Sequence, residues 1–114
     1  MSASDPPAPP ARLISQLLQE DAELRDIVEE FVAGLDTRLG ELRDAHAKLD
    51  FAMLSTLAHR LKGAAGSYGY PDISRVCADM EHKFRTHQAG DFAGFVAELT
   101  DYAAAAKAGL VEPT

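Results

Sequence analysis

The sequence predicts an all-α fold, an antiparallel four-helix bundle with a short additional N-terminal helix. Apolar residues recur at helical rather than alternating spacing from Ala11 to Gly109, and this stretch holds a single proline, Pro71. No run of β-branched residues bounded by tight-turn dipeptides indicates a strand. The length of 114 residues fits one domain, and a hydrophobic fraction of 46% is enough to build a core.

The chain is expected to begin with a flexible tail, because residues 1–10 are rich in proline, which does not sustain a helix. A short first helix is predicted at about 11–19, with Leu13, Leu17 and Leu18 as its apolar residues, and it would act as a lid on the bundle. We expect the folded domain to span residues 11–110. Residues 111–114 would then form a C-terminal tail.

A long helix is expected next, at about 21–49, with Asp21 as its N-cap. When successive residues are placed 100° apart, its apolar residues fall within roughly 140° of arc, which makes one continuous stripe over about seven turns. These residues are Leu24, Ile27, Val28, Phe31, Val32, Leu35, Leu39, Leu42, Ala45 and Leu49. His46 falls inside the stripe, and we expect it to be a packed or half-exposed residue rather than a ligand.

Three further amphipathic helices are predicted, at about 51–68, 71–88 and 92–108. Asp50 and Asp91 are plausible N-caps for the first and the last of them, and Pro71 fits the first turn of the middle one. Gly90 would end the middle helix, whose apolar stripe consists of Ile73, Val76, Cys77, Met80 and Phe84. The last helix has Phe92, Phe95, Val96, Leu99, Tyr102 and Ala106 as apolar residues.

Charge and cysteine content exclude several classes of protein. A formal charge of −7 without a basic run argues against nucleic-acid binding, which depends on neutralising phosphates. Cys77 is the only cysteine, so no intrachain disulfide forms and no cysteine-based zinc site is expected. No apolar run approaches the ~20 residues of a membrane span, and the N-terminus lacks the features of a secretory signal. We therefore expect a cytoplasmic monomer that binds neither nucleic acid nor membrane.

The helix expected at 51–68 carries the residues with reactive chemistry. With His59 at zero, the apolar residues of this helix lie between about 120° and 260°, so that arc must face the core. It contains Met53, Leu54, Leu57, Ala58, Leu61, Ala64, Ala65 and Tyr68. His59 lies almost opposite its centre and should be exposed at mid-helix. The same exposed face holds Ser55, Lys62, Gly63, Gly66 and Ser67.

Two glycines three residues apart beside an exposed histidine call for an explanation, because glycine inside a helix is worse than alanine by about 1 kcal/mol. Gly63 and Gly66 could admit a partner to His59, or they could let another helix pack closely, and Gly66 could also begin the helix end. A neutral imidazole is a competent nucleophile, and Lys62, one turn away, could meet an incoming phosphoryl oxygen. No glycine-rich loop precedes the lysine as a P-loop requires, and no metal-binding pair of histidines is evident.

The segment HRLKGAAGSYG, residues 59–69, resembles the signature of histidine-containing phosphotransfer (HPt) domains. The resemblance extends over nearly the whole folded part, through the segment DAEL at 21–24, Phe31, the helix start at Asp50, and the pair Met80 and Glu81. His46 is a departure, since the family more often has an aliphatic residue there. It puts the local packing in doubt rather than the chemistry.

The resemblance implies a phosphorelay function with no autonomous kinase activity and no cofactor of the chain's own. His59 would accept a phosphoryl group from the aspartate of a response-regulator receiver domain, or from an upstream (hybrid) histidine kinase, and pass it to another receiver. Mg²⁺ would be supplied by the receiver. Lys62 would steady the phosphoryl group, and Gly63 would admit the partner. Glu81 would hydrogen-bond the other ring nitrogen with support from Arg85, and its place at the edge of the apolar stripe independently allows that reach.

Two alternatives remain open at the level of sequence. The chain could be the phospho-accepting domain of a chemotaxis-type histidine kinase, which Glu81 mildly favours, although we expect no catalytic domain after a last helix that ends so near Thr114. It could also be a docking module that transfers nothing, but such a module would not need His59. A kinase dimerisation domain is excluded, because its histidine is followed by an acidic residue and here Arg60 follows.

Overall fold

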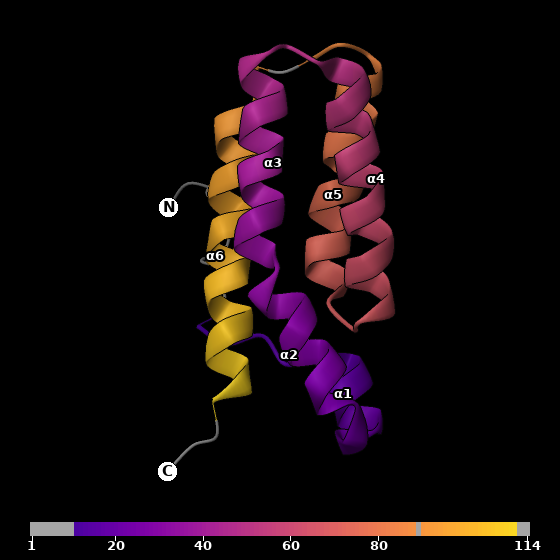
Figure 1. The fold of residues 1–114 in the computed structure, drawn as a ribbon, viewed down its shortest axis with the longest axis vertical. Helices are drawn as coiled ribbons and strands as arrows, with labels where there is room; N and C mark the ends of the chain where they lie inside the picture. The colour runs from indigo at the N-terminus through magenta and orange to yellow at the C-terminus, as the bar shows by residue number, and fades with distance from the viewer. Residues whose placement is uncertain (1–10, 89, 112–114) are drawn as a thin grey trace, which may run out of the picture.

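The computed structural model describes residues 11–88 and 90–111, and within them the chain is helical and without strands (Figure 1). The predicted tail at 1–10 lies outside the described residues, as do residues 112–114 of the predicted C-terminal tail. The elements in order are α1 (Gln16–Glu20), the 3-10 helix η1 (Ala22–Leu24), α2 (Arg25–Ala33), α3 (Leu35–Ala47), α4 (Phe51–Ser67), α5 (Pro71–Arg85) and α6 (Phe92–Leu110).

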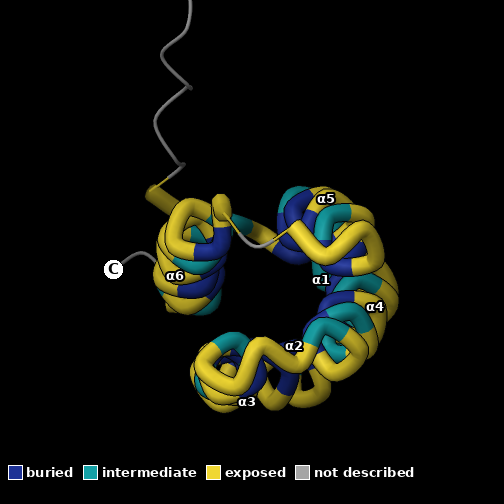
Figure 2. Tube along the Cα trace, turned by 90° about the horizontal axis from the view of Figure 1, so that it is seen from above, coloured by how far each residue is buried: buried dark blue, intermediate teal, exposed yellow. Residues whose placement is uncertain are grey.

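Helices α3, α4, α5 and α6 form the predicted antiparallel bundle. Figure 1 shows that α4, α5 and α6 each run in the direction opposite to the helix before them. Seen from above, in Figure 2, the four helices surround a common centre, and their buried residues face it. The closest pair is α4 and α5, and α6 closes the ring against α3 and α5. No helix in the described part of the chain is long and apolar enough to cross a membrane.

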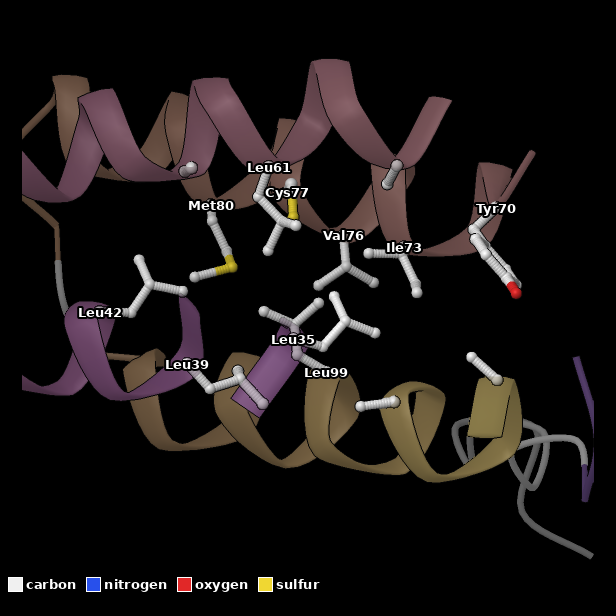
Figure 3. Close-up of a cluster of buried hydrophobic side chains, with 14 of the residues drawn as sticks. Leu35, Leu39, Leu42, Leu61, Tyr70, Ile73, Val76, Cys77, Met80 and Leu99 are labelled. Carbon is white, nitrogen blue, oxygen red and sulfur yellow. The ribbon is translucent and has the colours of Figure 1, made fainter. Parts of the chain in front are cut away.

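The core is filled by the predicted apolar stripes. The complete stripe of α5 is buried, as are the central residues of α3 and α4. Figure 3 shows side chains from α3, α4, α5 and α6 meeting in the middle of the bundle, among them Leu39, Leu61, Met80 and Leu99. Tyr70, between α4 and α5, closes one end of the cluster, and its buried hydroxyl has no hydrogen-bond partner among the described residues.

The prediction of one long helix over residues 21–49 is wrong, because the chain bends at Gly34 between α2 and α3 (Figure 1). Gly34 has a ψ of −6°, well away from the helical value, and its N–H is shared between the carbonyls of Glu30 and Phe31. The bend carries α2 beneath the end of α4. There the ring of Phe31 stacks on Tyr68 with centroids 4.9 Å apart. The bend thus allows α2 to pack this aromatic pair against the turn between α4 and α5.

The prediction of a first helix at 11–19 is wrong in its bounds, since α1 begins only at Gln16. Before it, the chain lies along α6, where the N–H of Leu13 donates to the carbonyl of Ala105. The buried Ser15 is the N-cap of α1, and its hydroxyl also donates to the carbonyl of Tyr68 over 2.6 Å. The short helix therefore closes the end of the bundle where α4 turns into α5.

The remaining helix starts are as predicted, whereas some ends and faces differ. Asp50 caps α4 by accepting the N–H of Met53 at 3.0 Å, but Asp91 makes no side-chain cap bond at α6. Helix α5 ends at Arg85 rather than near residue 88, because His87 has a φ of 58°. Three residues assigned to apolar faces, Ile27, Leu49 and Met53, are exposed instead.

Candidate functional site

Helix α4 presents His59 to solvent, as its angular position predicted. The side chain is 62% exposed, whereas Leu54, Ala58 and Leu61 on the opposite side of the helix are buried. Burial of that apolar face fixes the rotation of α4, and the rotation leaves the imidazole outside the bundle. The exposure of His59 is therefore a consequence of the core packing.

Glu81 on α5 lies directly beside His59, although its carboxylate is almost fully buried. Nδ1 of His59 lies 3.0 Å from Oε2 of Glu81. Because an ionised carboxylate can only accept a hydrogen bond, the ring carries its proton on Nδ1. Nε2 then keeps a free lone pair, and it belongs to the exposed ring. The predicted contact between Glu81 and His59 is present in the structure.

Besides the imidazole, two cationic side chains contact the carboxylate of Glu81. Nζ of Lys62 donates to Oε1 over 2.7 Å, and Nη2 of Arg85 forms an ion pair with Oε2 at 2.6 Å. The hydrogen bond from Lys62 is the largest cause of a lowered pKa of Glu81, and it outweighs the opposing effect of burial. His59 and Arg85 lower this pKa further. The carboxylate is therefore held ionised within the protein surface.

The register of α4 against α5, which brings these groups together, is supported by a contact that the sequence did not indicate. The hydroxyl of Ser74 on α5 donates to the backbone carbonyl of Lys62 over 2.9 Å. A side chain on Gly66 would meet this hydroxyl at an ordinary contact distance of 3.6 Å. A lone serine on an amphipathic helix gives no signal for such a role, so only the structure reveals it.

His59, Glu81 and Arg85 line a shallow pocket of about 250 Å³ at the protein surface. The other lining residues are Ser55, Thr56 and Arg60, all from α4. Of these, only Ser55 was placed on the reactive face by the sequence. Thr56 was missed, although its position about 60° from His59 on the helical wheel places it on the same face. Its hydroxyl donates to the carbonyl of Ala52 within its own helix. The lining is polar and contains two guanidinium groups, which suits an anionic group.

Gly63, beside His59, is surrounded by open space rather than by a packing contact. A Cβ atom on Gly63 would meet nothing within 4 Å, so no neighbouring helix requires a glycine there. Of the two explanations that the sequence left open, access of a partner is the one that this geometry favours for Gly63. Gly66 and Ser67 are also exposed, but they lie outside the pocket around His59.

The described residues include no group of three or more potential ligands that could hold a metal ion. Cys77 is buried in the core, and burial raises the pKa of its thiol to about 12, so it is no nucleophile. The reactive group of the site is the imidazole of His59, with Nε2 as its free nitrogen. Three cationic side chains and one carboxylate surround it.

Comparison with known proteins identifies the family of this domain. The sequence model of the Hpt domain matches residues 26–109, a stretch that contains α3, α4, α5 and almost all of α6, with every residue of the pocket. No curated protein and no solved structure matches the chain. The matched stretch covers well over half of the sequence. The chain therefore belongs to the Hpt domain family, the histidine phosphotransfer modules of phosphorelays.

Proposed function

We propose that this protein is a phosphorelay intermediate in which His59 accepts a phosphoryl group from the phospho-aspartate of one receiver domain and passes it to another. The observation that carries this proposal is the exposed imidazole whose Nδ1 is bound to the buried Glu81 at 3.0 Å. This contact leaves Nε2 as the nucleophile. A histidine kinase is an alternative donor for the same nitrogen.

The transfer step requires a nucleophile and charge compensation. The lone pair of Nε2 attacks phosphorus, the bond from phosphorus to the aspartyl oxygen breaks, and the aspartate leaves as a carboxylate. The proton on Nδ1 stays on the ring, which becomes a cationic phospho-imidazolium. Glu81 faces that charge through the hydrogen bond already present, so the site is arranged before the partner arrives.

Lys62 supports the phosphoryl group in this proposal. An ammonium group has three N–H donors, and Glu81 takes one of them. The side chain is 35% exposed and lies one turn beyond His59, so its remaining donors can meet phosphoryl oxygens. Gly63 leaves the approach to this group open, as its free surroundings indicate.

The partners that we propose are the receiver domains of response regulators and an upstream histidine kinase. They would dock on the exposed face of α4 and α5 around His59, where Ser55, Thr56, Arg60 and Arg85 line the pocket. A transient interface of this kind is small. The protein would act as a cytoplasmic monomer without a cofactor of its own, since Mg²⁺ would come with the receiver. We do not expect ATP alone to label it.

Substitution of His59 tests the proposal. Wild-type protein incubated with a panel of phosphorylated receivers is expected to acquire an acid-labile, alkali-stable label, and His59→Gln should lose all of it with unchanged helical circular dichroism. His82→Gln is a matched control, because His82 is an exposed histidine of α5 outside the pocket. Label that persists in His59→Gln would contradict the assignment.

A second candidate is the phospho-accepting domain of a chemotaxis-type histidine kinase, which the bond between Glu81 and His59 favours. The donor distinguishes the two. Rapid labelling by a chemotaxis-type kinase, with none from any phosphorylated receiver, would identify the second candidate. Labelling from receivers supports the relay.

A further inference from the structure

One oxygen of Glu81 contacts two side chains. Oε2 accepts Nδ1 of His59 at 3.0 Å and lies 2.6 Å from Nη2 of Arg85, whereas Lys62 has Oε1 to itself. Arg85 and the imidazole therefore share one acceptor atom, so the guanidinium charge acts on the oxygen that holds the Nδ1 proton. The Arg85 side chain is 64% exposed, so this contact lies at the rim of the pocket and not in the core.

The proton on Nδ1 decides how readily a phosphoryl group leaves Nε2. If the proton is present, the phosphorus–nitrogen bond breaks with its electron pair going to nitrogen, and the leaving group is neutral imidazole. If Nδ1 has lost the proton, the leaving group would be an imidazolate anion, which leaves poorly. An acceptor that holds the Nδ1 proton thus makes phosphohistidine a better donor, and also shortens its lifetime in water.

We propose that Arg85 is a positioning residue that limits how strongly Glu81 holds the Nδ1 proton, and thereby sets the lifetime and transfer rate of phosphorylated His59. This inference rests on the proposed function. A guanidinium on Oε2 draws part of the carboxylate charge away from the ring. Without it, Glu81 would stabilise the protonated phospho-imidazolium more strongly, and the labile form would persist to higher pH.

Arg85 is the group through which this balance is best tested. The charged residues facing Glu81 and His59 are Lys62 and Arg60 from α4 and Arg85 from α5, and the other pocket residues are uncharged. Lys62 is itself proposed to bind the phosphoryl group, so its replacement would alter two effects at once. Arg60 makes no ion pair with Glu81, unlike Arg85.

The experiment follows the hydrolysis of phosphohistidine as a function of pH, with phosphoramidate as the phosphoryl donor and ³¹P NMR as the readout. In Arg85→Gln the midpoint of the pH profile should move upward by roughly half a unit to one unit, the effect of one charge about 5 Å away in water-like surroundings. Hydrolysis on the alkaline side of the midpoint should then be about threefold to tenfold faster. Arg85→Lys, which keeps a cation, should restore most of the wild-type profile.

Arg75→Gln is the matched control, since it also removes an exposed arginine from α5. Arg75 contacts Asp72 and Tyr102 and not Glu81. A profile of Arg85→Gln that superposes on the wild type would overturn the inference. A shift shared equally by Arg75→Gln would do the same, because it would reflect net charge alone.

The failure of the proposed function looks different. In that case wild-type His59 acquires no label from any phosphorylated receiver, whether or not phosphoramidate labels it. The coupling through Glu81 is then still measurable in the unphosphorylated protein from the ¹⁵N shifts of the imidazole ring. They should show Nδ1 as the protonated nitrogen in the wild type, with a stronger hydrogen bond to Glu81 in Arg85→Gln. Ring shifts identical in the two proteins would refute the inference.

Discussion

Replacement of Gly63 by glutamine separates the stability of the domain from its proposed transfer reaction. Gly63 lies within α4, one turn beyond His59 on the exposed face, and a Cβ atom there would meet nothing within 4 Å. The substitution therefore introduces no clash within the domain. It places a flexible side chain where a docking receiver would approach the imidazole.

The expected effect on stability is favourable. Glutamine is better than glycine in a helix interior by roughly 0.5 kcal/mol, and it also restricts the unfolded chain. For a domain of about 100 residues such a gain raises the melting temperature by about 2–4 °C.

The rate of phosphotransfer should nevertheless fall steeply. A side chain that keeps the phospho-aspartate about 1 Å from its productive position can lower the rate ~10²-fold.

Denaturant unfolding and a phosphotransfer assay on the same preparation measure both effects. Gly94→Gln is the control, because Gly94 lies in α6, also has open space around it, and is far from the pocket around His59. It should also tolerate glutamine without loss of stability, and transfer should be unchanged. A clear drop in the unfolding midpoint of Gly63→Gln with unimpaired transfer would refute the access explanation and indicate a packing role.

Three further predictions concern stability. The hydrogen bond from Lys62 lowers the pKa of Glu81 below its ordinary value of 4.5. The ionised carboxylate therefore stabilises the fold above pH 4.5, and this stabilisation is lost as the pH falls through the lowered pKa. Denaturant unfolding of Glu81→Gln should accordingly show a smaller loss of stability in acid than the wild type, and an equal loss would contradict this. Tyr70→Phe removes a buried hydroxyl without a hydrogen-bond partner among the described residues. In thermal unfolding, the free energy of unfolding should be unchanged or higher by up to about 1 kcal/mol. A decrease of that size would instead reveal a partner of the hydroxyl. Gly69 has a φ of 88°, and a Cβ atom there would lie 2.7 Å from the backbone nitrogen of Gln16. Gly69→Ala should therefore lower the free energy of unfolding by at least ~1–2 kcal/mol. An unchanged unfolding midpoint would count against the docked position of α1.

The sequence predicted the bundle because its apolar stripes are regular, but the bend at Gly34 escaped it. The apolar residues before and after Gly34 keep the same angular position on a helical wheel, so periodicity alone cannot reveal a change of axis. The bend accompanies a tertiary contact that the sequence does not show, the stacking of Phe31 on Tyr68 in the turn between α4 and α5. Ser15 was missed for a similar reason, since its hydroxyl bonds to the distant carbonyl of Tyr68.

The site was predictable to the extent that it depends on the rotation of single helices. His59 lies opposite the apolar arc of α4, so its exposure follows from burial of that arc. The reach of Glu81 likewise follows from its place at the edge of the α5 stripe. The shared use of Oε2 by His59 and Arg85 could not be predicted, because it depends on how far α4 and α5 are shifted along each other, which the bond from Ser74 to Lys62 helps to fix.

Burial of Glu81 connects the stability of the domain with its proposed chemistry. A carboxylate taken out of water is tolerated only when other groups replace its hydration, and here Lys62, Arg85 and the Nδ1 proton of His59 do so. The same three contacts orient the imidazole, fix its tautomer and gather positive charge on a chain whose formal net charge is −7. The local charge suits the acidic phospho-aspartate of a receiver, while the overall negative charge disfavours unspecific binding to other anions. The arrangement that stabilises a buried charge is thus also the one that leaves Nε2 free and faces the phosphoryl group with cations.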